Sequence, residues 1–156
     1  MFLVLRATFY AALFIGLVLI KFPGWLASPA LEFPASMGWP QRGGVTVMLL
    51  GLSLMLWCVA MFVAVGRGTP APFDPPRRLV ARGPYAIVRN PMYLGAVLMV
   101  SGAALFYESM ALQWYAWCFF GLAHLMVVSY EEPKLRDTFG DSYDAYCSSV
   151  GRWVPR

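Results

Sequence analysis

The stretch Ala81–Gly95, ARGPYAIVRNPMYLG, joins a basic loop directly to an apolar segment, and the fold can be worked out from this junction. Asn90 suits the position before a helix, because its side-chain oxygen can accept a hydrogen bond from an unpaired backbone N–H. Pro91 suits the first helical position, where the missing N–H costs nothing. Apolar residues follow at once. The stretch therefore predicts a helix start that carries a polar site at a membrane surface.

The composition of the whole chain agrees with a membrane protein. Of its 156 residues, 60% are hydrophobic and 13% charged, with a mean hydropathy of +0.61. Soluble chains carry about 25% charged residues. The charges are missing from long blocks, which is typical of membrane spans. We expect one all-α membrane domain over residues 1–156, without room for a second.

Four apolar blocks are long enough to be spans, at about residues 2–20, 43–65, 91–107 and 110–130. A basic, proline-rich loop fills 66–90, and a tail with apolar residues three and four apart fills 131–156. The tail predicts a short amphipathic helix lying at the membrane interface. For residues 2–20 a signal peptide is the alternative, but the block length and the following Lys21 favour a retained span.

Positive charge is distributed unevenly between the two sides that these spans define. Ten of the twelve Lys and Arg fall on the side of the basic loop and both ends, and only Lys21 and Arg42 fall on the other. The positive-inside rule then predicts a multi-pass protein of the cell (inner) membrane, with its termini and site cytoplasmic. This bias and contact with anionic lipids account for the net charge of +4, so no nucleic-acid partner is expected.

Cysteine and histidine usage gives no sign of a metal site. The three cysteines form no CxxC pair, and buried inert thiols are the simplest interpretation. The single histidine, His124, has no cysteine at ligand spacing. No Walker loop, dinucleotide fingerprint or Ser-His-Asp order is present.

The acidic pair Glu131-Glu132 follows the last apolar block, at the end of a helix that already carries partial negative charge. A cation should compensate it: either an arginine, which would make this an ordinary solvated helix end, or a positively charged ligand. His124 precedes Glu131 by about two turns and should share its face. We take Tyr93 and His124 as candidate catalytic residues, the alternatives being an interfacial anchor for Tyr93 and a structural hydrogen bond for His124. Glu108 is expected on the opposite membrane side.

Several separated motifs carry a resemblance to a known family. They are Gly83-Pro84-Tyr85, Arg89-Asn90-Pro91-Met92-Tyr93-Leu94-Gly95, Glu131-Glu132-Pro133, Leu135, Phe139-Gly140, Tyr143, Tyr146 and Arg152-Trp153. In this order around apolar spans, residues 77–156 resemble the isoprenylcysteine carboxyl methyltransferase and phospholipid methyltransferase superfamily. Its members are integral membrane enzymes that use S-adenosylmethionine.

The resemblance implies a methyl transfer from S-adenosylmethionine to a small apolar or lipid-like acceptor, an amine, thiol, hydroxyl or carboxylate. It also implies a cofactor site that combines the basic loop, the start of the third span and the acidic pair. The matching positions are Leu79, Val80, Tyr85, Arg89, Asn90, Pro91, Met92, Tyr93, Glu131 and Glu132.

Two departures from the family pattern bear on this function. Asn90 stands where the family usually has histidine, which preserves hydrogen bonding but not titration near neutral pH. The segment before Glu131 lacks the basic residues of the prenylcysteine enzymes, which weakens a prenylcysteine acceptor. A non-catalytic lipid-binding protein on the same scaffold is the main alternative. A reductase ranks last, because the chain is short and has no dinucleotide motif.

Overall fold

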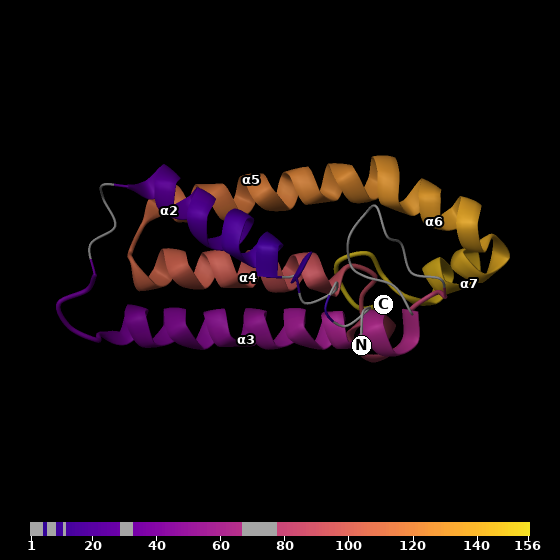
Figure 1. Cartoon of the computed structure of the whole chain (residues 1–156), viewed down its shortest axis with the longest axis horizontal. Coiled ribbons are helices and arrows are strands. Elements are labelled where there is room, and N and C mark those ends of the chain that lie inside the picture. Colours follow the sequence, from indigo (N-terminus) through magenta and orange to yellow (C-terminus); the bar gives the residue numbers. More distant parts are fainter. Residues whose placement is uncertain (1–4, 6–8, 11, 29–32, 67–77) are drawn as a thin grey trace.

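Three long helices run side by side along the molecule. The structure, a computed structural model, describes residues 5, 9–10, 12–28, 33–66 and 78–156, and this part of the chain contains helices and no β-strand. Helix α4 (Pro91–Phe106) lies between α3 (Trp39–Met61) and α5 (Met110–Met126) (Figure 1). The all-α fold expected from the sequence is confirmed.

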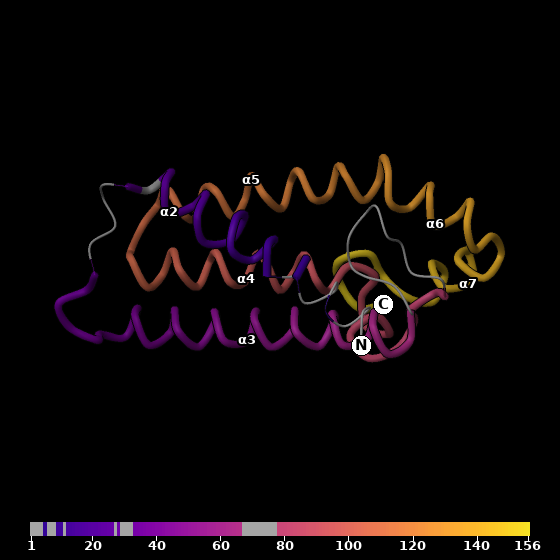
Figure 2. Tube along the Cα trace, viewed as in Figure 1, coloured from indigo at the N-terminus to yellow at the C-terminus, as the bar shows by residue number. Residues whose placement is uncertain are grey.

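The helix of the N-terminal part includes a π-helix, η1 (Ile15–Lys21), continued by α2 (Phe22–Ala27), and it lies against α4 and α5 (Figure 2). The helix thus continues beyond the expected end of the first span at Ile20, and residues 2–4, 6–8 and 11 of that span lie outside the described residues. Lys21 does not end the helix because a lysine can extend its charged head to the interface. Pro23 lies within this continuous helix, directly after the π-helical turns of η1.

Helix α3 begins at Trp39, earlier than the expected Gly43, and continues as the π-helix η2 (Phe62–Gly66). Pro40 occupies its first turn, and the Arg42 guanidinium lies 5.6 Å from the centre of the Trp39 ring. An arginine that stacks on an aromatic ring is accommodated in a helix end without breaking it. The charge of Arg42 therefore marked the wrong boundary.

Glycines let α3 and α4 approach closely. A Cβ atom added to Gly44 would lie 2.6 Å from the carbonyl oxygen of Gly102, and one added to Gly51 would lie 2.6 Å from that of Gly95. Small residues at facing positions are what allow helix backbones to touch in membrane proteins. This contact fixes the start of α4 relative to α3.

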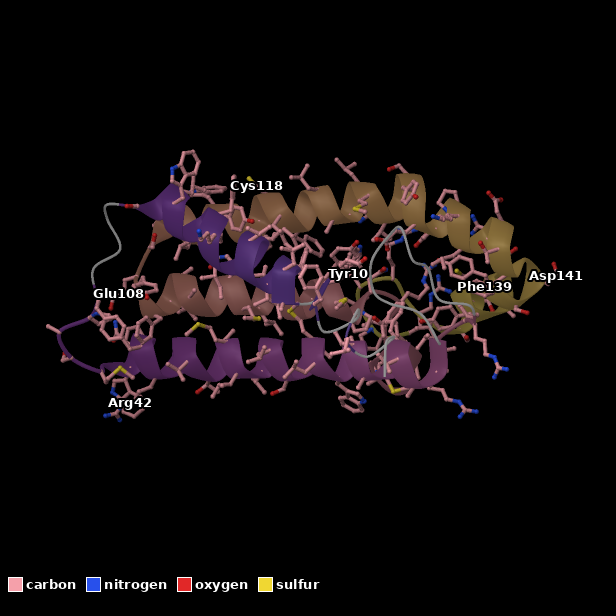
Figure 3. All side chains as sticks on the ribbon, in the orientation of Figure 1. Tyr10, Arg42, Glu108, Cys118, Phe139 and Asp141 are labelled. Carbon is pink, nitrogen blue, oxygen red and sulfur yellow. The ribbon has the colours of Figure 1, made fainter. Side chains whose placement is uncertain are left out.

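A tight turn, Tyr107–Ser109, joins α4 to α5 at one end of the bundle. Glu108 adopts a left-handed conformation there, with φ 49°. Its Oε1 accepts a hydrogen bond of 2.9 Å from Nε2 of Gln41 at the start of α3. Glu108 and Phe139 lie at opposite ends of the molecule, as expected for Glu108 (Figure 3).

At the other end, α5 continues without a break through a π-helix, η4 (Val127–Glu131), into α6 (Glu132–Phe139). Gly140, with φ 51°, then turns the chain back into α7 (Asp141–Ser149). The apolar stripe of the tail packs inward: Tyr143, Tyr146 and Val150 are buried with Leu79, Leu135, Phe139 and Cys147. The stripe that suggested an interfacial helix is thus largely used inside the protein, and an interfacial location of the tail stays a prediction.

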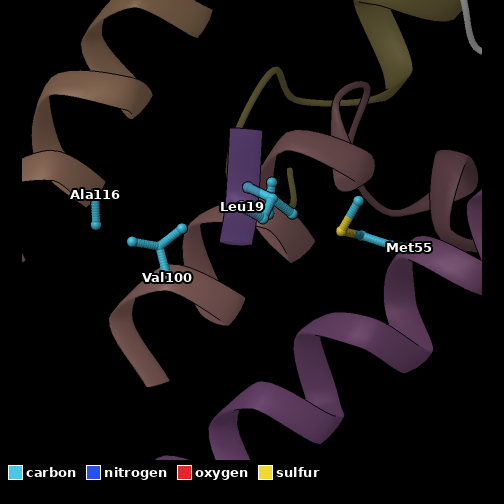
Figure 4. Packing of buried hydrophobic residues seen from close by; sticks show 5 residues of the cluster. Leu19, Met55, Val100 and Ala116 are labelled. Atoms are coloured by element: carbon cyan, nitrogen blue, oxygen red, sulfur yellow. The ribbon is translucent and has the colours of Figure 1, made fainter. Parts of the chain in front are cut away.

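Two helices of the described chain are long and apolar enough to cross a membrane, Trp39–Gly66 and Met110–Phe139. The helices Ala12–Leu26 and Pro91–Phe106 are apolar but shorter. All four contribute to one core, in which Leu19, Met55, Val100 and Ala116 meet (Figure 4). The protein is therefore a helical membrane protein, and the count of about four spans stays a prediction.

Candidate functional site

The start of α4 is held by the C-terminal tail. Arg89 N–H donates a 2.8 Å hydrogen bond to the carbonyl oxygen of Gly151, and Val88 forms an isolated parallel bridge with the same residue. Pro91 is the first helical residue, as expected. The side chain of Asn90 makes no capping bond, which corrects the sequence-based expectation; its Nδ2 instead donates to the carbonyl oxygen of Arg152, at 3.2 Å. The amide is used to join two segments because the tail presents an unpaired carbonyl there.

Glu132 is buried and compensated by two arginines. Its carboxylate accepts hydrogen bonds from Nε and Nη2 of Arg152, at 2.7 and 2.9 Å. Nη1 of Arg89 lies 3.2 Å from its Oε1. A bidentate guanidinium is the arrangement that best offsets the cost of burying a carboxylate. Arg89 belongs to the predicted basic loop, and Arg152 belongs to the tail.

Glu131 has a different environment, although it is the next residue. It is half-buried and accepts a hydrogen bond from the hydroxyl of Tyr93. Among the described residues it has no ion-pair partner, so its charge is not compensated as that of Glu132 is. Since Tyr93 lies in the first turn of α4 and Glu131 ends η4, this bond joins the two distant motifs of the sequence. The π-helix that presents Glu131 is a feature often found at functional sites.

A pocket lies between these groups. It encloses a cavity of about 120 Å³, with further open space at its mouth. Nine of the ten predicted cofactor positions line it: Leu79, Val80, Tyr85, Arg89, Asn90, Met92, Tyr93, Glu131 and Glu132. Pro91 is fully buried and does not line it.

Sequence reasoning missed five residues that line the same pocket: Phe62, Val127, Leu135, Tyr143 and Tyr146. Leu135, Tyr143 and Tyr146 belong to the apolar stripe of the tail, which was assigned to the membrane interface. The fold-back at Gly140 turns this stripe toward the pocket. Arg152 was also missed as a partner of Glu132, although the expected need for a cation was a usable signal.

Three buried tyrosines keep the inner wall neutral. Burial raises the pKa of Tyr85, Tyr143 and Tyr146 above the ordinary value of about 10, so their phenols, already neutral at pH 7, also stay protonated in mild alkali. The hydroxyl of Tyr146 donates a 2.6 Å hydrogen bond to the carbonyl oxygen of Tyr85. This bond ties α7 to the 3₁₀ turn η3 (Gly83–Ala86). The wall is therefore aromatic and uncharged.

Arg89 retains a donor that the described residues do not use. Its Nη1 donates to Sγ of Cys147, at 2.7 Å, and also faces Glu132. Its Nε is buried and has no hydrogen-bond partner. An unpaired buried donor costs free energy until a ligand or water satisfies it. Among the described residues, the pocket therefore has one carboxylate without an ion-pair partner, that of Glu131, and one guanidinium, that of Arg89, with a buried donor left unpaired.

His124 does not line the pocket but lies beside it. Its Nδ1 accepts a hydrogen bond of 3.0 Å from Nε1 of Trp153. The Trp153 ring in turn contacts that of Tyr93, with ring centres 6.4 Å apart. His124 and Glu131 therefore approach the start of α4 from the same helix, through different partners.

Comparison with known proteins identifies the family. No curated protein and no solved structure matches the chain. The family model for phospholipid methyltransferases matches residues 44–142, well over half of the chain, from the glycine contact of α3 to the start of α7. The matched segment contains the start of α4 and the acidic pair, and it ends before Arg152 and Trp153. The chain therefore belongs to the phospholipid methyltransferase family, within the superfamily of membrane methyltransferases that also includes the isoprenylcysteine carboxyl methyltransferases.

Proposed function

We propose that the protein transfers a methyl group from S-adenosylmethionine to a lipid-like acceptor, and that the pocket beside the start of α4 holds the cofactor. Membership of a family of membrane methyltransferases supports the reaction class. The observation that carries the proposal is the unequal treatment of the acidic pair. Two arginines compensate Glu132, whereas among the described residues Glu131 is paired with the neutral hydroxyl of Tyr93 and with no cation.

The charges of the pocket fit S-adenosylmethionine. A carboxylate without a cation favours a positively charged ligand group, here the ammonium or the sulfonium. Arg89 also lines the pocket, and its guanidinium suits the carboxylate of the methionyl part. The aromatic wall formed by Tyr85, Tyr143 and Phe62 suits an apolar or flat ligand surface. When bound, the cofactor supplies an electrophilic methyl group.

The protein's own contribution is orientation and exclusion of water. Tyr93 and Glu131 fix one side of the pocket, and the ion pairs of Glu132 fix the tail that closes another. Holding two reactants in line can account for much of the rate enhancement of a group transfer. The walls from α7 and η2 reduce the access of water to the reacting groups.

Charge distribution supports a cytoplasmic opening of the site. Arg89 and Arg152 lie at the pocket end of the bundle, the end that also carries most of the positive charge of the sequence. By the positive-inside rule this end faces the cytoplasm, where S-adenosylmethionine is available. The lipid-like acceptor would come from the bilayer beside the same helices.

The direct test is cofactor binding to the detergent-purified protein. Glu131→Gln should weaken binding of S-adenosylmethionine by roughly tenfold or more, because a charged contact is lost. Glu108→Gln is the matched control, since this carboxylate is also bonded to a neutral donor but lies at the far end of the molecule. Equal affinity in wild type and Glu131→Gln would remove the proposed site.

A second experiment identifies the methyl acceptor. Protein incubated with methyl-labelled cofactor and a membrane lipid extract should label one lipid class, which mass spectrometry then identifies. Wild-type protein that neither binds the cofactor nor labels any lipid would contradict the proposal and favour the non-catalytic lipid-binding alternative.

A further inference from the structure

Beside the pocket, the ring of Trp153 joins α5 to the start of α4. Its centre lies 4.9 Å from that of Phe120, 6.0 Å from that of His124 and 6.4 Å from that of Tyr93. Trp153 follows Arg152, whose two hydrogen bonds to Glu132 fix this part of the tail. Of this cluster Tyr93 lines the pocket, whereas Trp153, Phe120 and His124 do not, so the cluster adjoins the pocket through Tyr93.

The contact between Trp153 and His124 determines where the imidazole carries its proton. An indole nitrogen can only donate a hydrogen bond. Because Nε1 of Trp153 donates to Nδ1 of His124 over 3.0 Å, Nδ1 must present its lone pair, and the neutral ring then carries its proton on Nε2. Within the described part of the chain, Nε2 has no hydrogen-bond partner, and the side chain is half-buried. An N–H donor thus remains available beside Phe120.

Resting on the proposed function, we propose that His124 is a positioning residue for the methyl acceptor, with its Nε2–H donating a hydrogen bond to an oxygen atom of that acceptor. The apolar part of the acceptor would lie against Phe120 and Trp153, and the atom to be methylated would reach the pocket beside Tyr93. Since Nδ1 is occupied by Trp153, His124 acts as a donor and not as a general base. The acceptor class is an apolar molecule with an accepting oxygen close to the methylated atom.

Two variants of His124 separate donation from shape. His124→Phe keeps a ring for packing but removes both nitrogens, whereas His124→Gln places an amide N–H₂ donor on a side chain of similar reach. Wild-type protein and the variants are assayed in nanodiscs made from the lipid extract. Relative to wild type, His124→Phe should raise the KM for the labelled lipid by about tenfold, the effect of one lost hydrogen bond. His124→Gln should stay within about threefold of wild type. The dissociation constant of S-adenosylmethionine should not change in either variant.

Trp153→Phe tests the role of the indole. It keeps an aromatic ring against Phe120 and removes the N–H that fixes the imidazole. The ring can then carry its proton on either nitrogen, so KM should rise by about twofold to threefold, the cost of dividing the population between two tautomers. Since His124 is the single histidine of the chain, ¹⁵N NMR of histidine-labelled protein reports this tautomer without ambiguity.

The outcomes distinguish this inference from the proposed function. Wild-type protein with the proton on Nδ1, or His124→Phe with an unchanged KM, would overturn the role of His124 while leaving the methyl transfer intact. Wild-type protein that binds no cofactor would instead overturn the proposed function. Labelled products that contain phosphate would identify a phosphate oxygen as the group bound, and phosphate-free products would identify a carbonyl or carboxylate oxygen. Labelled products with no such oxygen would contradict the inference.

Discussion

The carboxylates at the two ends of the helical bundle have different partners. At the turn between α4 and α5, Glu108 is satisfied by one neutral amide, that of Gln41. At the far end, Glu132 is buried between two arginines, and Glu131, in the part of the chain that the structure describes, faces a pocket with one neutral donor. One end is a closed turn. The other combines buried ion pairs with a pocket, and this difference supports our proposal that the functional site lies at the second end.

The largest expected effect comes from removing the compensated carboxylate. Glu132→Ala leaves Arg89 buried without its counter-ion, which should lower the free energy of unfolding by about 3 kcal/mol. Glu108→Ala, at the other end, should lower the free energy of unfolding by about 1 kcal/mol, because it removes one part-buried hydrogen bond between an amide and a carboxylate. Denaturation of both variants in detergent measures the difference. Equal losses of unfolding free energy in the two variants would contradict the proposed difference between the two ends.

A smaller loss of stability is expected at the contact between α3 and α4, which depends on close packing and not on charge. Gly44→Ala places a methyl group 2.6 Å from the carbonyl oxygen of Gly102, so α3 and α4 must separate near the closed end. We expect a loss of about 2 kcal/mol from this overpacking. Gly43→Ala is the control: the neighbouring glycine has nothing within 4 Å of its added Cβ, and alanine there should be neutral or slightly stabilising. Thermal unfolding that ranks Gly43→Ala as the worse variant would refute the packing argument.

The smallest expected effect concerns pH and the aromatic wall of the pocket. Burial raises the pKa of Tyr146 in the folded protein, so only the unfolded chain releases this proton near pH 10. Stability from this group is complete below pH 10 and falls as the pH rises above it, by about 1.4 kcal/mol at pH 11. Tyr146→Phe should therefore show a shallower alkaline loss of stability than wild type. A variant with the same pH dependence as wild type would show that the phenol is not held neutral by the fold.

Much of the architecture could be predicted because it depends on composition and local signals. Pro91 at the first position of α4 and the turn near Glu108 followed from local rules on proline and on polar breaks. The pieces of the pocket were also visible in the sequence, since the motif before Tyr93 and the acidic pair at Glu131 are each distinctive. Their association around one pocket required the resemblance to a family in addition to the residues.

Other features could not be predicted because they depend on the path of the tail. The fold-back at Gly140 turns the apolar stripe of α7 into a wall of the pocket. Periodicity alone cannot say whether such a stripe faces lipid or protein. In the same way, Asn90 could be expected to cap its own helix through Oδ1, but its side chain is oriented by the bond that Nδ2 donates to the carbonyl oxygen of Arg152. Local rules fail here because a tertiary partner offers a hydrogen bond that the sequence does not reveal.

The sequence by itself determined that this is a helical membrane protein with a polar site at one end, because apolar block length and charge distribution are local properties. Only the tertiary structure decided which carboxylate is compensated and which is not. Glu131 and Glu132 are adjacent in the chain, yet successive residues of a helix point in different directions and meet different neighbours. The different charge environments of Glu131 and Glu132 follow from these different neighbours, which the spacing of residues in the sequence does not reveal.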